Sequence, residues 1–296
     1  MVTNSNHVEE AMTTELNALL IDEISVCTNG TRLNVATAGS GSPVLLMHGF
    51  PHTWRVWSAI IPVLAETHRV IAPDLRGLGA SQRDTTGYDA RNLATDMLGV
   101  LDALDEPQAA VVAIDAGAPP AFLLGLEHPA RVSRLVLMES TIGRLPGAED
   151  FFRAGPPWWF GFHAVPGLAE TVLEGHEAEY IDFFLRQGTA NGAGVDVGIR
   201  DAFVRAYVGR DSLRAAFEHY RAMPTNAAQI AEATANHRLT IPTLAIGGQV
   251  VGAATGGQLQ PISDHFENIL IPSSGHIVPL DQPAELLTRL LPFLMA

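Results

Sequence analysis

Short runs of apolar residues recur along the chain and predict buried β-strands. Residues 24–28 and 31–37 flank Asn29-Gly30, a pair that favours a tight hairpin because both residues accept positive φ. The later runs are VLLM (44–47), RVIAP (69–73), AAVVAI (109–114), RLVLM (134–138), PTLAI (242–246) and NILIP (268–272). Helical periodicity lies between most of them, as at 54–66 and 89–104. This alternation predicts an α/β fold with a mostly parallel sheet and helices on both faces.

The alternation is interrupted once, after the sixth predicted strand. From residue 139 to residue 241 the sequence is helical and aromatic, with no comparable strand. We therefore predict a core made of residues 21–140 and 236–296, with a helical cap, or lid, at 141–235. Residues 1–20 are expected to form an N-terminal tail.

Composition and charge argue against several classes of partner and binding site. The 296 residues are 47% hydrophobic, so the chain can bury a large core. Its 18 basic residues, all Arg, face 32 acidic ones, which gives a net charge of −14. Such a charge argues against partners made of nucleic acid or anionic membrane. Cys27 is the single cysteine, which excludes an intrachain disulfide and a thiolate metal site.

The first 15 residues carry acids and lack both the basic region and the apolar region of a signal peptide. No stretch reaches the roughly 18 apolar residues that a membrane-spanning helix needs. We therefore expect a cytoplasmic protein.

The segment VVAIDAGAPPAF (111–122) carries the most informative chemistry. A buried strand ends at Ile114, and Asp115 then stands between the small residues Ala113 and Gly117, ahead of a helix. This is the spacing of a nucleophile elbow, in which small flanking residues allow a sharp strand-to-helix turn. The alternative interpretation is that Asp115 only caps the helix that follows it.

Three further segments follow predicted strands. LLMHGFPHTW (45–54) places a His-Gly-Phe-Pro loop where an oxyanion-hole amide could lie. DLRGLGAS (74–81) follows the next strand, and SSGHIVPLDQP (273–283) places His276 in a loop before the last helix. His276 could instead be a loop histidine bonded only to backbone.

Taken in this order, the four segments resemble the α/β-hydrolase superfamily, and specifically its epoxide hydrolases. The resemblance runs from about residue 21 to the end of the chain. It implies that Asp115 attacks an epoxide carbon to form an alkyl-enzyme ester, which water activated by His276 then hydrolyses to a vicinal diol. The backbone N–H groups of Phe50 and Ala116 would stabilise the oxyanion. No cofactor and no metal are implied.

A third residue should orient His276. Many relatives carry an Asp after the strand that matches PTLAI, but GGQVVGAATGGQ (247–258) contains no carboxylate. Glu139, directly after the sixth strand, is the alternative acid. It could also be a solvated residue at the cap junction. Asp264, which we expect on a helix, is the second candidate.

Opening an epoxide requires donors to the developing alkoxide, which the family commonly supplies from two cap tyrosines. Tyr220 matches the later position, and Trp159 fits the earlier one, with Trp158 and His163 close by. An indole N–H can donate a hydrogen bond but cannot accept one, so Tyr220 would be the acid. The two tryptophans could equally be cap core or substrate-stacking surface.

The predicted pocket also includes His48, Pro51, Trp158 and His163, although the His48 ring is expected mainly to fix the oxyanion loop. The aromatic cap suggests a small apolar epoxide as substrate. A homodimer is the candidate assembly, but the sequence does not determine the oligomeric state.

Two other functions remain open. Haloalkane and haloacid dehalogenases share the Asp-His machinery. However, Ala116 stands where haloalkane-acting relatives usually carry Trp, and no Arg follows Asp115 closely to hold a haloacid carboxylate. A non-catalytic binding protein with the same fold is the second alternative.

Overall fold

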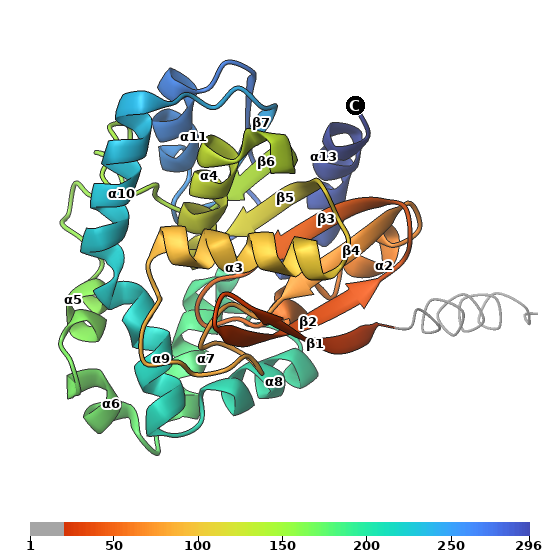
Figure 1. The fold of residues 1–296 in the computed structure, drawn as a ribbon. Coiled ribbons are helices and arrows are strands. Elements are labelled where there is room, and N and C mark those ends of the chain that lie inside the picture. The colour runs from red at the N-terminus through yellow and green to blue at the C-terminus, as the bar shows by residue number, and fades with distance from the viewer. Residues whose placement is uncertain (1–20) are drawn as a thin grey trace, which may run out of the picture.

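A computed structural model describes residues 21–296 of the protein, and the predicted tail at 1–20 lies outside the described residues. Its centre is an eight-stranded sheet with the order β1-β2-β4-β3-β5-β6-β7-β8 (Figure 1). β1 pairs with β2 and β2 with β4 in antiparallel fashion, and the remaining neighbours are parallel. The predicted fold class, α/β with a mostly parallel sheet, is confirmed.

The strands lie where the apolar runs predict them. They are β1 (Asp22–Thr28), β2 (Thr31–Ala38), β3 (Ser42–Met47), β4 (His68–Pro73), β5 (Ala109–Ile114), β6 (Val132–Met138), β7 (Thr243–Gly247) and β8 (Phe266–Leu270). The hairpin between β1 and β2 turns at Asn29 and Gly30, whose φ angles are 43° and 73°. The predicted hairpin is therefore confirmed.

Helices follow most of the strands. Within the core they are α2 (Ile61–Leu64), α3 (Ala90–Ala103), α4 (Ala118–Glu127), α11 (Ala254–Leu259), α12 (Val278–Asp281) and α13 (Pro283–Met295). The single helix expected at 54–66 is divided into a 3₁₀ turn at Trp54–Trp57 and α2. Pro62 in the first turn of α2 explains the break, because its ring has no N–H to continue a helix from the preceding turn.

Six α-helices lie between β6 and β7. They are α5 (Trp158–Ala164), α6 (Leu168–Leu173), α7 (Glu177–Gln187), α8 (Val197–Tyr207), α9 (Arg210–Arg221) and α10 (Met223–Asn236). Figure 1 shows α5 to α9 gathered at the lower left, while α10 runs from that group back towards α3 and α4. The chain thus leaves the sheet after β6, forms this helical layer, and returns to the sheet at β7.

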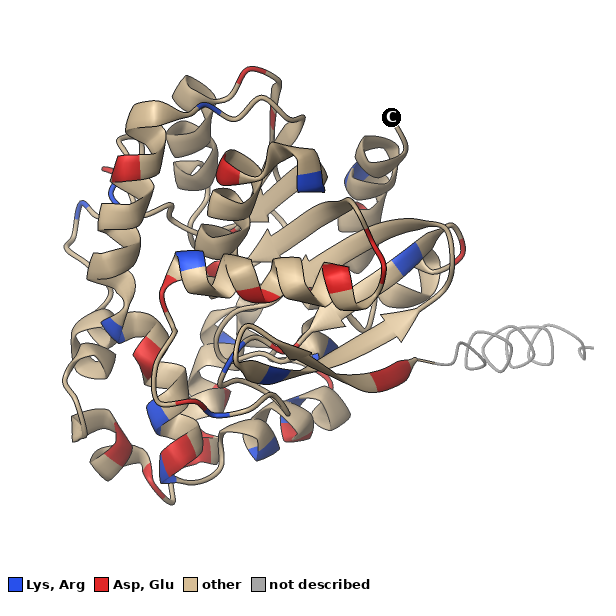
Figure 2. Cartoon of the chain, in the orientation of Figure 1, with Lys and Arg blue, Asp and Glu red and all other residues tan. Residues whose placement is uncertain are grey.

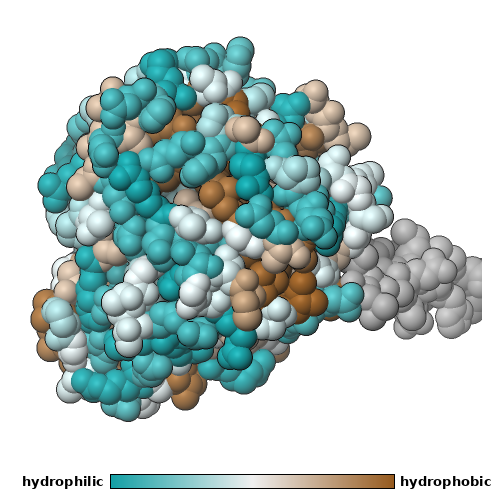
Figure 3. Space-filling model, in the orientation of Figure 1, coloured by the Kyte–Doolittle hydropathy of each residue, from teal (hydrophilic) through white to brown (hydrophobic). Residues whose placement is uncertain are grey.

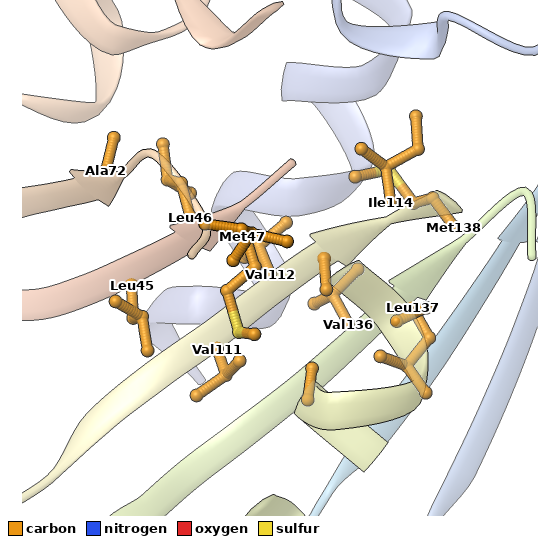
Figure 4. Close-up of a cluster of buried hydrophobic side chains, with 14 of the residues drawn as sticks. Leu45, Leu46, Met47, Ala72, Val111, Val112, Ile114, Val136, Leu137 and Met138 are labelled. Carbon is orange, nitrogen blue, oxygen red and sulfur yellow. The ribbon is translucent and has the colours of Figure 1, made fainter. Parts of the chain in front are cut away.

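The central strands carry the hydrophobic core. Figure 4 shows side chains of β3, β5 and β6 packed together, among them Leu46, Val112 and Leu137, and all three are fully buried. All six residues of β5 are buried, as expected for a strand covered on both faces. This rigid centre fixes the positions of the loops that follow each strand.

Charged residues of both signs are interspersed on the outer helices (Figure 2). Several form ion pairs, such as Arg200 with Asp182 at 2.7 Å and Arg221 with Glu170 at 2.7 Å. The face in Figure 3 is mainly hydrophilic, with apolar patches between polar side chains. Among the described residues, no helix is both long and apolar enough to cross a membrane.

Candidate active site

Asp115 occupies a sharp turn between β5 and α4. Its φ of 53° lies in the left-handed region that residues other than Gly seldom adopt. Gly117 permits the turn, because a Cβ at that position would approach the carbonyl oxygen of His48 to 2.5 Å. A Cβ on Gly49 would collide with the Asp115 side chain itself. Close approach of neighbouring atoms therefore requires glycine at positions 49 and 117.

Two backbone amides hold the Asp115 carboxylate. The N–H of Phe50 donates to Oδ1 at 2.8 Å, and the neighbouring N–H of Ala116 helps to lower the pKa of this carboxyl. These are the two amides that the sequence indicated for the oxyanion hole. Oδ1 thus lies where negative charge is stabilised, while Oδ2 remains directed towards His276.

His276 lies between two carboxylates. Its Nε2 is 3.2 Å from Asp115 Oδ2, and its Nδ1 is 3.2 Å from Glu139 Oε2. Asp115 and His276 keep 25% and 17% of their side-chain surface exposed, whereas Glu139 has none. The structure therefore places the side chains of the three predicted residues in one row of contacts, Asp115–His276–Glu139, with Glu139 at the buried end.

The loop at 247–258, which contains no carboxylate of its own, holds the side chain of Glu139. The backbone φ of Glu139 is 44°, and its side chain accepts hydrogen bonds from the N–H groups of Gly248 (2.5 Å), Val251 (2.9 Å) and Gly252 (3.1 Å). The loop after β7 thus supplies donors to an acid that comes from β6. A solvated Glu139 is incompatible with this burial.

The carboxylates and the imidazole shift one another's pKa values. Burial alone would lower the pKa of His276, but its hydrogen bonds and attraction to Asp115 and Glu139 raise it to about 10. Burial alone would raise the pKa of each carboxyl, yet the hydrogen bond to His276 and its charge lower both. The resting site is therefore an imidazolium between two carboxylates.

A cavity of about 150 Å³ opens in front of Asp115 and His276. Pro51 and Phe50 line it from the core, and Tyr220 and Trp159 line it from α9 and α5. Burial raises the pKa of Tyr220 well above its usual value, so its hydroxyl stays protonated. The cavity can therefore present a carboxylate and a phenol to one apolar substrate.

Two residues predicted for the pocket lie elsewhere. His48 is fully buried: its Nδ1 is 2.8 Å from the carbonyl oxygen of Gly49, and its Nε2 accepts from the Leu75 N–H at 3.2 Å. Its ring braces the oxyanion loop and does not line the cavity. Trp158 is 55% exposed on the outer side of α5 and is absent from the cavity wall.

His163 is also displaced from its predicted place, because it lies behind the cavity wall. Its ring stacks on Phe217 at 4.2 Å, and its Nε2 is 2.5 Å from the hydroxyl of Tyr180. The Tyr220 ring meets it edge-on at 4.3 Å. Burial lowers the pKa of His163 to about 3, so the ring is neutral.

The structure also corrects the expectations for Asp264. It lies between a 3₁₀ turn at Gln260–Ile262 and β8, and not on a helix. Its carboxylate pairs with Arg238 at 3.0 Å on the surface. It therefore has no contact with His276.

Several wall residues were not predicted from the sequence, namely His52, Phe184, His219 and Met223. His52 directly follows His-Gly-Phe-Pro, and that position could have drawn attention to it. The others come from the inserted helices, whose amphipathic pattern does not show which buried side chains border a cavity.

Comparisons with known proteins agree with this geometry. The family described as alpha/beta hydrolase fold matches residues 42–283. The soluble epoxide hydrolase of Corynebacterium sp. (strain C12) is 30% identical over 280 residues, which cover 90% of this chain and 94% of that protein. Epoxide hydrolase A of Mycobacterium tuberculosis (strain ATCC 25618 / H37Rv) is 28% identical over 312 residues, covering 91% and 96%.

Among solved structures, the epoxide hydrolase CorEH without ligand has a TM-score of 0.84 at 28% identity, covering 93% of this chain and 98% of that one. The chain therefore belongs to the α/β-hydrolase fold family and, within it, to the epoxide hydrolases. It is a hydrolase, and the resemblance noted from its motifs is confirmed.

Proposed function

We propose that this protein hydrolyses small apolar epoxides to vicinal diols through an ester on Asp115. The supporting observation is the Asp115 carboxylate itself. It faces an apolar cavity, with Oδ1 on the Phe50 N–H at 2.8 Å and Oδ2 beside His276 at 3.2 Å. Residues 141–235 serve in this proposal as the cap that supplies the opposite wall.

In the first step, Asp115 Oδ2 attacks an epoxide carbon and forms a C–O bond. The epoxide C–O bond breaks, and the alkoxide takes the hydroxyl proton of Tyr220. Tyr220 suits this role because burial keeps its pKa high and the phenol protonated until the alkoxide forms. Trp159 is the second donor in this proposal, since it lies on the same wall.

In the second step, the ester no longer carries the negative charge of Asp115. His276 then keeps only Glu139 as an ionised neighbour, so its pKa falls and it can act as a base. The proton that His276 loses passes to the Tyr220 phenolate and restores the phenol. His276 next takes a proton from water, and the hydroxide attacks the ester carbonyl carbon.

The carbonyl oxygen, Oδ1, becomes the oxyanion held by the amides of Phe50 and Ala116. Collapse of this intermediate breaks the ester bond, and the departing alkoxide takes the proton from His276. The Asp115 carboxylic acid that is left then passes its own proton to His276, 3.2 Å away, which restores the carboxylate and the imidazolium. The two steps together convert one epoxide and one water into one diol and restore the enzyme.

A single turnover in ¹⁸O-labelled water tests this mechanism. We expect the label in the Asp115 carboxylate, because water attacks the ester carbonyl and not the substrate carbon. Asp115→Asn should abolish steady-state turnover. Label found only in the diol of the first turnover would contradict the ester mechanism, and halide release from haloacids without diol formation would favour a dehalogenase.

A further inference from the structure

The turn that carries His276 is held by a hydrogen bond on each side of the histidine. The N–H of Gly275 donates to Oδ2 of Asp281 at 2.6 Å, and the N–H of Ile277 donates to the carbonyl oxygen of Gly188 at 2.8 Å. Gly188 directly follows α7, so the second bond comes from the helices inserted between β6 and β7. The backbone of the proposed base is therefore fixed partly from outside the sheet.

One carboxylate oxygen of Asp281 also joins this turn to the segment after α7. Oδ2 accepts the Gly275 N–H and, at 2.8 Å, the N–H of Ala190. Asp281 is the last residue of α12, and Ala190 lies 91 positions earlier in the chain. Hydrogen bonds to a carboxylate are shorter and stronger than those between neutral groups. The Asp281 carboxylate is thus a strong link between the turn of His276 and the inserted helices.

The two linked segments lie backbone against backbone. A Cβ on Gly275 would approach the carbonyl oxygen of Gly188 to 2.5 Å and the backbone nitrogen of Ala190 to 2.9 Å. A Cβ on Gly188 would approach the side chain of Ile277 to 2.8 Å. Because close-packed interiors have low compressibility and transmit strain, a displacement of residues 188–190 is passed to the turn of His276.

The contacts of His276 leave little tolerance for such a displacement. Its two ring nitrogens are each 3.2 Å from a carboxylate oxygen, of Asp115 on one side and of Glu139 on the other. Protein N–H···O hydrogen bonds span about 2.7–3.2 Å, so both contacts are at the long end of the range. A misplacement of about 1 Å can lower a rate about 10²-fold. The position of the His276 backbone therefore matters for the proposed reaction.

We propose that Asp281 is a positioning residue that fixes the turn of His276 to the segment after α7. The proposal rests on the proposed function, since it requires an ester on Asp115 that His276 hydrolyses. Asp281 is not part of the cavity wall, and it neither gains nor loses a proton in the reaction. It acts through the position of His276, so it affects mainly ester hydrolysis, the step in which His276 is the base.

The test measures ester formation and ester hydrolysis separately, by rapid quenching of the alkyl-enzyme with enzyme in excess over one epoxide. We expect Asp281→Ala to slow hydrolysis about 10²-fold, as for a base misplaced by about 1 Å, and to slow ester formation less. Asp281→Asn should keep most of the hydrolysis rate, because its amide oxygen can accept the same two N–H groups.

The pH dependence of ester hydrolysis separates positioning from stability. In the ester Asp115 carries no charge, and His52 is neutral because burial lowers its pKa to about 3. Glu139 then remains as the charged group that raises the pKa of His276. A displaced His276 loses part of this attraction, so the pH of half-maximal hydrolysis should fall in Asp281→Ala and stay at the wild-type value in Asp281→Asn.

Ala190→Pro removes the same link from its other end and leaves Asp281 in place. Ala190 opens a 3₁₀ turn at Ala190–Gly192, and Thr189 before it is extended, with φ −109° and ψ 148°. Proline is tolerated at a first helical position after an extended residue, and it has no N–H to donate to Asp281. We expect this variant to slow ester hydrolysis more than ester formation, by less than Asp281→Ala does.

Glu177→Ala is the matched control. It also removes a carboxylate that accepts two backbone N–H groups, those of Gly175 and Gly209, both at 3.0 Å. Glu177 lies in α7 and is not part of the cavity wall. The variant should lower the melting temperature and leave the ratio of the two rates and the pH of half-maximal hydrolysis unchanged.

Equal slowing of both half-reactions with an unchanged pH profile in Asp281→Ala would show that the link only stabilises the fold, and would overturn the proposal. So would ester hydrolysis at the wild-type rate in folded Asp281→Ala or Ala190→Pro. Absence of any alkyl-enzyme in the wild-type protein would instead overturn the proposed function, so the two failures are distinguishable.

Discussion

The two walls of the cavity beside Asp115 and His276 are built in different ways. On the sheet side, Asp115 and Glu139 follow parallel strands, and backbone N–H groups fix their carboxylates at 2.5 to 3.1 Å. On the cap side, Tyr220 and Trp159 are positioned by aromatic packing, at 5.6 Å from Phe50 and 5.4 Å from Phe184 between ring centroids. One wall depends on directional hydrogen bonds to backbone, and the other depends on packing.

This difference should appear as a difference in tolerance to substitution. Hydrogen bonds to charged groups are strong and geometrically strict, whereas aromatic contacts accept several arrangements. We therefore expect the largest losses from changes on the sheet side. The cap side should show one essential hydroxyl and otherwise graded effects.

Glu139→Gln, on the sheet side, should cause a larger loss of activity than any single change on the cap side. The amide keeps the shape of the side chain but removes the charge that orients His276 and stabilises its protonated form. Loss of the equivalent acid in the Ser-His-Asp template costs about 10⁴ in rate. Ester hydrolysis should slow more than ester formation, so the alkyl-enzyme should accumulate in rapid-quench experiments.

Asp264→Asn is the control for that variant, because its carboxylate pairs with Arg238 on the surface. It should turn over at the wild-type rate. Near-normal turnover of Glu139→Gln would show that the buried carboxylate is not the acid of the site.

Tyr220→Phe should slow ester formation by about 10²–10⁴, the usual contribution of a general acid. The phenyl ring keeps the packing against Phe50 but cannot supply a proton. The measurement is the pre-steady-state alkylation rate on one epoxide. Tyr88→Phe is the matched control, since its hydroxyl bonds to the Asp84 carbonyl at 2.7 Å outside the cavity wall.

Stability should fall as pH rises above neutrality. The pKa of His276 is raised from 6.5 to about 10, so the stability that it contributes is complete below pH 6.5 and is lost as pH rises towards 10. Melting temperatures measured between pH 6 and pH 10 should therefore decline. The decline should be smaller in Glu139→Gln, which lacks one of the two charges that raise this pKa.

The stability that Asp115 and Glu139 contribute on the sheet side should also fall in acid. The pKa values of Asp115 and Glu139 lie below 3.8 and 4.5, so their contribution is present above those values and is lost as pH falls through the folded-state pKa. A flat melting temperature from pH 6 to 10 in the wild-type protein would contradict an imidazolium between two carboxylates.

Among the substitutions of cavity-wall residues, Trp159→Phe should slow the reaction least. It keeps most of the apolar area and deletes one neutral donor, which is worth about 0.5–1.5 kcal/mol, or about 2- to 13-fold in the alkylation rate. Trp158→Phe should have no effect, because Trp158 is 55% exposed outside the cavity. A loss in His163→Phe that Trp159→Phe does not share would move the second donor to His163.

The inserted helices show the limit of prediction from sequence. Their aromatic residues indicated an apolar cap, but Trp158 and Trp159 are neighbours in sequence and only Trp159 reaches the cavity wall. His163 was a third candidate donor, yet it stacks on Phe217 behind the wall. Amphipathic periodicity says which residues are buried, and it does not say which of them border a space.

The sequence by itself determined the fold class and the order of the chemical groups along it. Apolar runs that alternate with helical segments specify a mostly parallel sheet, and the carboxyl ends of parallel strands meet at one edge. Asp115, Glu139 and His276 each follow such a strand, so their meeting was predictable without coordinates.

Only the tertiary structure decided how those groups are held. The loop after β7 has no carboxylate, and folding places its N–H groups on Glu139 from the neighbouring strand. Folding likewise buries His52 opposite His276, although the two residues lie far apart in the chain. Hydrogen bonds and packing between distant segments depend on distances that a one-dimensional pattern does not contain.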